Sequence, residues 1–414
     1  MKKTSLLALI LVLALCLPLL ASCDGRNNEE DSTAAGNTET TASSEETNVD
    51  IQETTNISET IETPENSETT TAPDTTIAPE NSETTTAPET TVVPETEPEE
   101  DPITGEVING HYVTEDKAYQ LYNFNEQHAN RYVQCVMNLA IKLNGLADVY
   151  SIVAPTSAVI YLSDREYQAL GTTIGREGIE YVYDEIAKYS EQLVASGDIS
   201  SPVNTINLYD CLSSHRDEYI YYRTDHHWAA LGAYYASRYF LDTVGKSYPS
   251  LDEYKEIRID NFLGAFYNST QSTCLENNPD TVYAYESPTV TKFKVLAKNA
   301  TALKVKPIIN PNVTSWNKYV CFINGDMPYS VIHNETINDE SAILIIKDSF
   351  GNAFSPMLAD SYEYVHIIDY RHWSGDLATF VQDNNVDTVL LLINSKAPTS
   401  NTSMTNLEKF LNQE

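Results

Sequence analysis

The sequence contains little positive charge and few histidines or cysteines. Lys and Arg number 25 against 60 Asp and Glu, and the formal net charge at pH 7 is −35. Nucleic-acid binding needs a basic surface, so this balance argues against a nucleic-acid partner. The six cysteines include no CxxC pair, so the spacing of a zinc cluster is absent. Cys135, Cys211, Cys274 and Cys321 could form one or two disulfides, although Cys135 lies in an apolar pattern typical of a core residue.

The N-terminal apolar run is too short to span a membrane. It extends from Leu6 to Leu20, whereas a membrane helix needs roughly 20 residues. Lys2 and Lys3 precede it and small residues follow, which is typical of a secretory signal. Leu-Ala-Ser-Cys at 20–23 resembles a bacterial lipobox, so we predict a lipoprotein signal peptide at 1–22 and an acylated Cys23. Acyl chains would hold the protein on the outer face of a membrane. The alternative is an ordinary signal peptide in which this cysteine has no role.

Large apolar side chains are nearly absent from the next segment, residues 23–104. It consists mainly of Thr, Glu, Ser, Pro and Asn, and PENSETTTAP occurs at 64 and again at 79. Such a segment cannot bury enough surface to offset chain entropy, so we predict a disordered tether. Residues 24–102 hold 22 acidic residues and one basic residue, Arg26. Most of the net charge therefore belongs to the tether.

Residues 105–414 have the helix and strand patterns of one α/β domain. Apolar residues recur at helical spacing over 117–144, 178–195 and 228–244, and each of these segments ends near a glycine. DVYSIVAP at 148–155 is typical of a buried strand that proline ends. Residues 250–320 lack this alternation and contain short strand-like pieces. We expect them to form a β-rich insertion or lid.

The C-terminal third predicts a parallel sheet with helices on both faces. Strongly apolar strands at 342–348, 364–370 and 387–394 alternate with helical patterns at 349–359 and 374–385. In such sheets ligands bind at the carboxyl ends of the strands. This rule places Ser349, residues 369–371 and Asn394 along one edge. Residues 155–157 join them if the strand at 148–154 belongs to the same sheet.

Ser349 stands between a buried strand and the helix that follows it. Its hydroxyl would be exposed there, and the unpaired N–H groups of the first helical turn could stabilise an oxyanion. The alternative is that Asp348 and Ser349 only cap the helix. A nucleophilic hydroxyl also needs a base, and the base needs a group that orients it.

TDHHW at 224–228 could supply that base and its orienting acid. On an extended backbone Asp225 and His227 share one face, and His226 points away. Asp225 could then hold one ring nitrogen of His227. A helix starting at Trp228 would favour the neutral imidazole, whereas the charge of Asp225 would favour the protonated form. The rival interpretation is a metal site made by residues 225–227 and His215. Adjacent histidines diverge, however, and no HExxH pair exists, so we expect no metal.

TDHHW together with IIKDSFGNAFSPML at 345–358, IIDYR at 367–371 and DTVLLLIN at 387–394 resembles the DHHW family of bacterial surface proteins. That family resembles the SGNH-like proteins that O-acetylate alginate, in which an Asp-x-His-Trp element precedes an Asp-Ser-Phe element. The matching positions are Asp225, His227 and Trp228, then Asp348, Ser349 and Phe350. The resemblance implies an SGNH-like fold, with Ser349 as nucleophile, His227 as general base and Asp225 as its orienting acid.

The sequence departs from the ordinary SGNH pattern in three respects. The serine follows the Asp/His pair, the pair is spaced Asp-x-His, and Lys347 replaces the glycine of Gly-Asp-Ser. The family's conserved asparagine has a candidate in Asn394, and Asn352 is a second candidate oxyanion donor. Arg371 could hold a substrate carboxylate or sugar.

These observations favour a lipid-anchored, extracytoplasmic O-acyl (acetyl) transferase or esterase that needs no cofactor. Its substrate would be a surface polysaccharide or a peptidoglycan-type glycan, with the acyl donor supplied by a membrane partner. The alternative is a non-catalytic glycan-binding or scaffold protein on the same fold.

Overall fold

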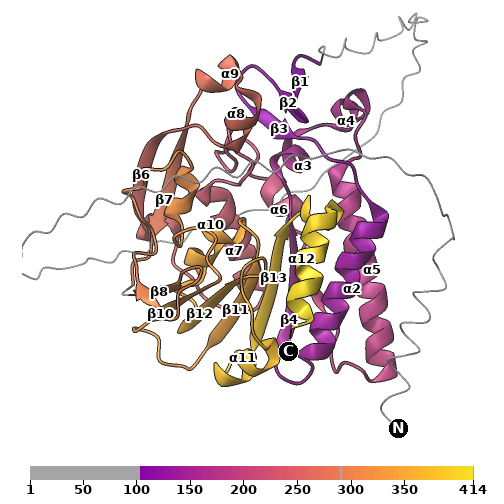
Figure 1. The fold of residues 1–414 in the computed structure, drawn as a ribbon, viewed down its shortest axis with the longest axis vertical. Coiled ribbons are helices and arrows are strands. Elements are labelled where there is room, and N and C mark those ends of the chain that lie inside the picture. Colours follow the sequence, from indigo (N-terminus) through magenta and orange to yellow (C-terminus); the bar gives the residue numbers. More distant parts are fainter. Residues whose placement is uncertain (1–102, 290, 414) are drawn as a thin grey trace, which may run out of the picture. The chain divides into compact units, whose positions relative to one another are not determined.

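The computed structural model describes residues 103–289 and 291–413, in which an eight-stranded mixed sheet carries helices on its faces (Figure 1). The strand order is β5-β4-β13-β11-β12-β10-β8-β9. The first five strands in that order are parallel to one another, and β10, β8 and β9 continue the sheet in antiparallel fashion. The strands are β4 (Asp148–Ala154), β5 (Asn204–Thr205), β8 (Thr291–Leu296), β9 (Lys304–Val305), β10 (Tyr329–Asn334), β11 (Ala342–Lys347), β12 (Tyr364–Asp369) and β13 (Thr388–Asn394).

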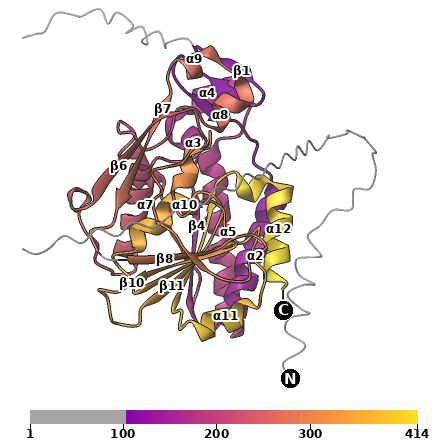
Figure 2. The same ribbon diagram turned by 60° about the vertical axis from the view of Figure 1, so that its left-hand side comes forward.

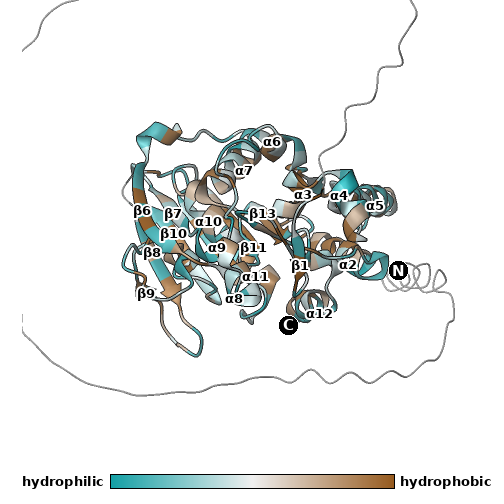
Figure 3. Cartoon of the chain, turned by 90° about the horizontal axis from the view of Figure 1, so that it is seen from above, coloured by the Kyte–Doolittle hydropathy of each residue, from teal (hydrophilic) through white to brown (hydrophobic). Residues whose placement is uncertain are grey.

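Helices cover both faces of this sheet (Figures 1 and 2). One face carries α2 (Glu126–Lys142), α5 (Gly175–Ser196) and α12 (Asn401–Leu411), and the other carries α7 (Ala230–Thr243) and α10 (Gly351–Phe354). The view from above shows apolar residues on the central strands and polar residues on the outer sides of the helices (Figure 3). All six side chains of β11 are buried, as expected for a strand covered on both faces. The predicted fold class is confirmed.

Shorter elements complete the described chain. A separate antiparallel sheet contains β1 (Glu106–Ile108), β2 (His111–Val113) and β3 (Ala118–Gln120). The remaining α-helices are α3 (Ser157–Tyr161), α4 (Asp164–Leu170), α6 (Tyr209–Ser213), α8 (Ala265–Thr270), α9 (Thr273–Glu276) and α11 (Leu377–Asp383). Short 3-10 turns are η1 (Leu251–Glu253), η2 (Lys318–Cys321), η3 (Ser355–Leu358) and η4 (Ala397–Thr399).

Two predicted helices are shorter in the structure. The first begins at Glu126 rather than near 117, because Asn125 caps it by accepting the His128 N–H and the preceding residues form β3. The other begins at Ala230 rather than Trp228. Trp228 instead forms an isolated antiparallel bridge with Tyr221, which keeps its backbone extended.

Residues 250–320 are partly built into the main sheet. Strands β6 (Lys255–Phe262) and β7 (Asp280–Glu286) pair with each other alone, whereas β8 and β9 extend the main sheet beyond β10. Phe293 and Val295 on β8 are buried in the large core. The expected insertion is therefore β-rich but not separate from the sheet.

The described residues contain four free thiols and no disulfide, and Cys135 is buried. Over these same residues no helix has both the length and the apolar character needed to cross a membrane. The predicted signal peptide, Cys23 acylation and almost all of the tether lie outside the described residues.

His366 on β12 makes folding stability depend on pH. Its side chain is buried, with its Nδ1 2.8 Å from the Tyr329 hydroxyl, and burial lowers its pKa to about 4. An unfolded histidine titrates near pH 6.5, so between about 6.5 and 4 the unfolded chain binds more protons than the folded one. We expect the free energy of unfolding to fall as the pH drops through this window. Urea unfolding should show a smaller fall in His366→Gln, and an equal fall in both proteins would contradict this assignment.

Candidate active site

The carboxyl ends of four neighbouring parallel strands meet at one pocket of about 260 Å³. Thr156 follows β4, Ser349 follows β11, Arg371 follows β12 and Asn394 ends β13, and all four line it. Strand β4 pairs with β13 along its whole length, which is why residues 155–157 reach the same edge. The strand-end rule therefore placed these residues correctly.

Asp225, His227 and Ser349 form a continuous hydrogen-bonded series. His227 Nδ1 lies 2.6 Å from Asp225 Oδ1, and its Nε2 lies 2.8 Å from Ser349 Oγ. Asp225 and His227 are buried, whereas Ser349 is partly exposed to the pocket. When Nδ1 of His227 carries the ring hydrogen and donates it to the Asp225 carboxylate, Nε2 is free to accept the hydroxyl hydrogen of Ser349. A series of this kind can activate a serine hydroxyl for nucleophilic attack.

The backbone bends at TDHHW instead of remaining extended. The cause is local, because Asp225 Oδ1 also accepts the backbone N–H of His227 at 3.1 Å. The bend brings the rings of His226 and His227 within 3.9 Å of each other and turns His226 toward the pocket. The expectation that His226 points away is therefore wrong. Burial and the neighbouring His227 lower the pKa of His226 to about 4.

The N-terminal end of α8 also contacts the Asp225 carboxylate. The backbone N–H of Ala265 donates to Asp225 Oδ2 at 2.8 Å. Gly264 packs so closely that a Cβ there would lie 2.3 Å from Asp225 Cβ, so only glycine fits. Burial would raise the pKa of the Asp225 carboxyl. The electrostatic influence of the neighbouring His226 and His227, with the hydrogen bonds from His227 and Ala265, holds that pKa well below its usual range.

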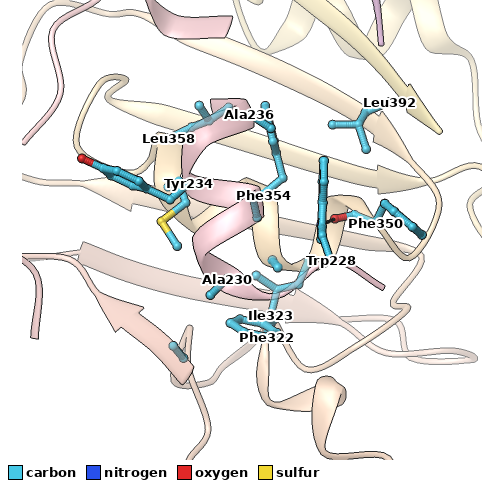
Figure 4. Packing of buried hydrophobic residues seen from close by; sticks show 14 of the residues in the cluster. Trp228, Ala230, Tyr234, Ala236, Phe322, Ile323, Phe350, Phe354, Leu358 and Leu392 are labelled. Atoms are coloured by element: carbon cyan, nitrogen blue, oxygen red, sulfur yellow. Dashed lines mark hydrogen bonds between the residues drawn. The ribbon is translucent and has the colours of Figure 1, made fainter. Parts of the chain in front are cut away.

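Trp228 and Tyr319 fasten the histidine to the serine turn. The indole N–H of Trp228 donates to the Phe350 carbonyl at 3.0 Å, and Figure 4 shows the two side chains together in the core. Tyr319 lies parallel to the His227 ring at 3.8 Å, and its hydroxyl donates to the Ser349 carbonyl at 3.0 Å. His227 and the turn that carries Ser349 are thus fixed to each other through two buried aromatic residues.

Asp348 and Asn394 brace the turn that carries Ser349. Asp348 Oδ1 accepts the Phe350 N–H, and its Oδ2 accepts both the backbone N–H and the side-chain amide of Asn394. Burial raises the pKa of Asp348. One amide hydrogen of Asn394 is used in this way, and the side chain has a second.

Asn352 and Arg371 belong to a buried ionic cluster around Lys347. Lys347 Nζ contacts Asn352 Oδ1 at 2.7 Å, Asp369 Oδ2 at 3.1 Å and Asp326 Oδ1 at 3.3 Å. The Asn352 amide donates to Asp326 Oδ1 at 2.9 Å. Arg371 pairs with Asp369 at 2.6 Å and with Asp326 at 2.9 Å. The candidate oxyanion donor Asn352 does not line the pocket, and the Arg371 guanidinium, although at its wall, is engaged by two carboxylates.

The geometry brings together three of the four residues of the alternative metal site. Asp225, His226 and His227 place candidate ligand atoms within 4.8 Å of one another. His215 is outside this group and pairs with Glu218 at 2.6 Å. Both ring nitrogens of His227 already have partners in Asp225 and Ser349, so a metal would have to displace one of these contacts.

Sequence reasoning missed several residues of the site. Gly264 and Tyr319 come from the segment 250–320 without clear periodicity, Asp326 follows that segment, and nothing local pointed to them. Lys396 lines the pocket and lies two residues after Asn394, the last residue of β13. A strand-end rule that included the few residues after each strand could have found it.

The fold and the strand-end site define an SGNH-like α/β protein. The chain belongs to the DHHW protein family, whose model matches residues 42–368. A DHHW family protein from Eubacterium siraeum is 25% identical with a TM-score of 0.62, covering 74% of this chain and 97% of that one. Bacillus cereus PatB1 is 19% identical with a TM-score of 0.56, covering 72% and 98%.

Two further comparisons complete these findings. The O-acetyltransferase domain of Pseudomonas putida AlgJ matches more loosely, at 11% identity and a TM-score of 0.34, covering 69% of this chain and 91% of that one. No curated protein matches the sequence.

Proposed function

We propose that the protein is an extracytoplasmic, serine-dependent O-acyltransferase or esterase acting on a cell-surface polysaccharide. The observation that carries this proposal is the hydrogen-bonded series from Asp225 through His227 to Ser349 at the mouth of a pocket. A hydroxyl at the end of a buried strand, with an oriented imidazole within hydrogen-bond distance, is equipped for nucleophilic attack on an ester. The predicted signal peptide and acylated Cys23 support a position outside the cytoplasm, with a lipid anchor.

The proposed reaction has two steps. Ser349 Oγ attacks the acyl carbonyl carbon while its proton passes to His227 Nε2, and Asp225 stabilises the imidazolium. The second amide hydrogen of Asn394 supports the oxyanion. His227 then gives the proton to the departing oxygen, and the acyl group remains on Ser349. In the second step a sugar hydroxyl or water gives its proton to His227 and attacks the acyl carbon. The bond from that carbon to Ser349 Oγ then breaks, and His227 returns the proton to Oγ, which restores the free serine.

The test is detection of the acyl-enzyme. The purified protein is mixed with 4-nitrophenyl acetate, and intact-mass and peptide spectrometry should locate one acetyl group on Ser349. A sulfonyl fluoride is a second probe, since activated hydroxyl groups attack sulfonyl centres, and Bacillus cereus PatB1 has been solved with a sulfonyl adduct. Acceptance of the acetyl group by added oligosaccharide, rather than by water, would identify a transferase. Neither adduct nor turnover would favour a glycan-binding protein on this fold.

Gly264→Ala should lower kcat about 10²-fold. The added methyl group cannot fit beside Asp225, so it displaces the carboxylate from His227, and an error of about 1 Å in catalytic geometry costs this much. Steady-state kinetics with 4-nitrophenyl acetate measures the effect, and circular dichroism checks that the variant is folded. A folded variant with unchanged kcat would show that Asp225 is not needed in this position.

A further inference from the structure

Lys396 is an unpaired cation in the pocket that contains Ser349. It lies two residues beyond the end of β13, is partly buried, and lines this pocket. Across residues 103–289 and 291–413, no carboxylate forms an ion pair with its ammonium group, and no hydrogen bond to that group is found. By contrast, Lys347 and Arg371 at the same end of the sheet are each paired with Asp326 and Asp369.

The pocket has no free acid of its own to neutralise Lys396. Asp348 is the only carboxylate in its lining, and both Asp348 oxygens already accept hydrogen bonds from Phe350 and Asn394. His226, which lines the same pocket, has a pKa lowered to about 4 by burial, then by His227, with a smaller effect of Lys396. It is therefore neutral at neutral pH and does not compete with Lys396 for an anion.

An ammonium that is partly removed from water and left unpaired is unfavourable, and a bound anion removes that penalty. Burial lowers the pKa of Lys396, as expected for such a group. A negatively charged ligand would therefore gain more here than at an exposed lysine, because the pocket has already excluded part of the solvent.

We infer that Lys396 binds a negatively charged substituent, a carboxylate or phosphate, of the glycan whose hydroxyl or ester reacts at Ser349. The inference rests on the proposed function and names its substrate class. The pocket lies near the lower end of the roughly 300–1,000 Å³ of small-ligand sites, so it accommodates about one sugar unit. The charged group and the reacting oxygen accordingly belong to the same sugar or to adjacent ones.

Three small sugars test this inference by binding alone. Methyl β-glucuronide carries a carboxylate where methyl β-glucoside carries a hydroxymethyl group, and glucose 6-phosphate carries a phosphate. Calorimetric or NMR titration of the full chain should give at least about tenfold tighter binding of one or both anionic sugars than of the glucoside, as expected of a charge-assisted hydrogen bond. Lys396→Gln should abolish that preference, and Lys396→Arg should retain it. Lys409→Gln, an exposed lysine on α12, is the matched control and should bind like the native protein.

The outcomes separate this inference from the proposed function. Preference for the glucuronide alone supports a uronic-acid glycan, and preference for the phosphate alone supports a phosphorylated one. Equal affinity for all three sugars, or a preference that survives in Lys396→Gln, overturns the inference even if Ser349 is acetylated by 4-nitrophenyl acetate. Failure of Ser349 to form that adduct instead overturns the proposed function, and with it the assignment of the anion to a reacting glycan.

Discussion

Replacing Ser349 with alanine should remove the acetyl adduct and lower kcat for 4-nitrophenyl acetate at least about 10³-fold. The hydroxyl is the only atom of this residue within hydrogen-bond distance of His227 Nε2, at 2.8 Å. Without it His227 has no side-chain hydroxyl to activate at this position. Alanine fits the site because the side chain is small and partly exposed, so the fold should be unaffected. Nitrophenolate release and intact mass provide the two measurements.

The control is Ser201→Ala, which removes an exposed hydroxyl before β5 at the opposite end of the sheet. It should keep full turnover and a single adduct. Turnover that persists in Ser349→Ala and is abolished by a chelator would instead favour metal chemistry at residues 225–227. That result would contradict both the adduct mechanism and the expectation of a metal-free site.

Lys347→Ala should destabilise the folded protein by about 3 kcal/mol, at the lower end of what is measured when one partner of a buried ion pair is removed. The Lys347 side chain is 1% exposed and Asp369 is completely buried, so the loss leaves two carboxylates facing Arg371 alone. Burial acts to raise the pKa of Asp326, but Lys347 and Arg371 hold it below its usual range. Replacing Lys347 removes one of the two positive charges that offset the burial of the Asp326 carboxylate. Urea denaturation at neutral pH measures the change.

A lysine outside the core gives the comparison. Lys409→Ala removes an exposed ammonium and should change the free energy of unfolding by no more than about 0.5 kcal/mol. Equal effects of the two substitutions would mean that the Lys347 cluster contributes nothing to stability. At low pH the two variants should converge, because protonation of Asp326 and Asp369 removes the charges that Lys347 offsets. Both carboxyls have lowered pKa values, so this contribution is present at neutral pH and is lost as the pH falls below about 4.

The parallel core of the fold was predictable because its strands are apolar without alternation. Strands β4, β11, β12 and β13 each correspond to a predicted segment, and their burial on both faces favours a parallel sheet. Once the strands are parallel, the side chains at their carboxyl ends must meet. That rule brought Ser349, Arg371 and Asn394 to one pocket without any knowledge of tertiary contacts.

The remaining parts of the site depend on contacts that no local pattern encodes. His226 faces the pocket because Asp225 hydrogen-bonds the backbone two residues on, which bends the chain. Tyr319 reaches His227 from the short 3-10 turn η2. Arg371 was a reasonable choice of substrate-binding cation from its position, but Asp326, which pairs with it, lies 45 positions earlier. Tertiary packing places Asp326 beside Lys347 and Arg371, and Lys396 is the cation of this pocket that is left without a carboxylate partner among the described residues.

The position of β13 in the sheet has a consequence for synthesis of the chain. This strand, close to the C-terminus, lies between β4 and β11, so β4 has no partner on that side until residues 388–394 leave the ribosome or the export channel. Contacts between such distant segments form slowly, because a long loop must close first. We therefore expect nascent chains and fragments that lack β13 to depend on chaperones or to be degraded, and to show no reactivity toward esters.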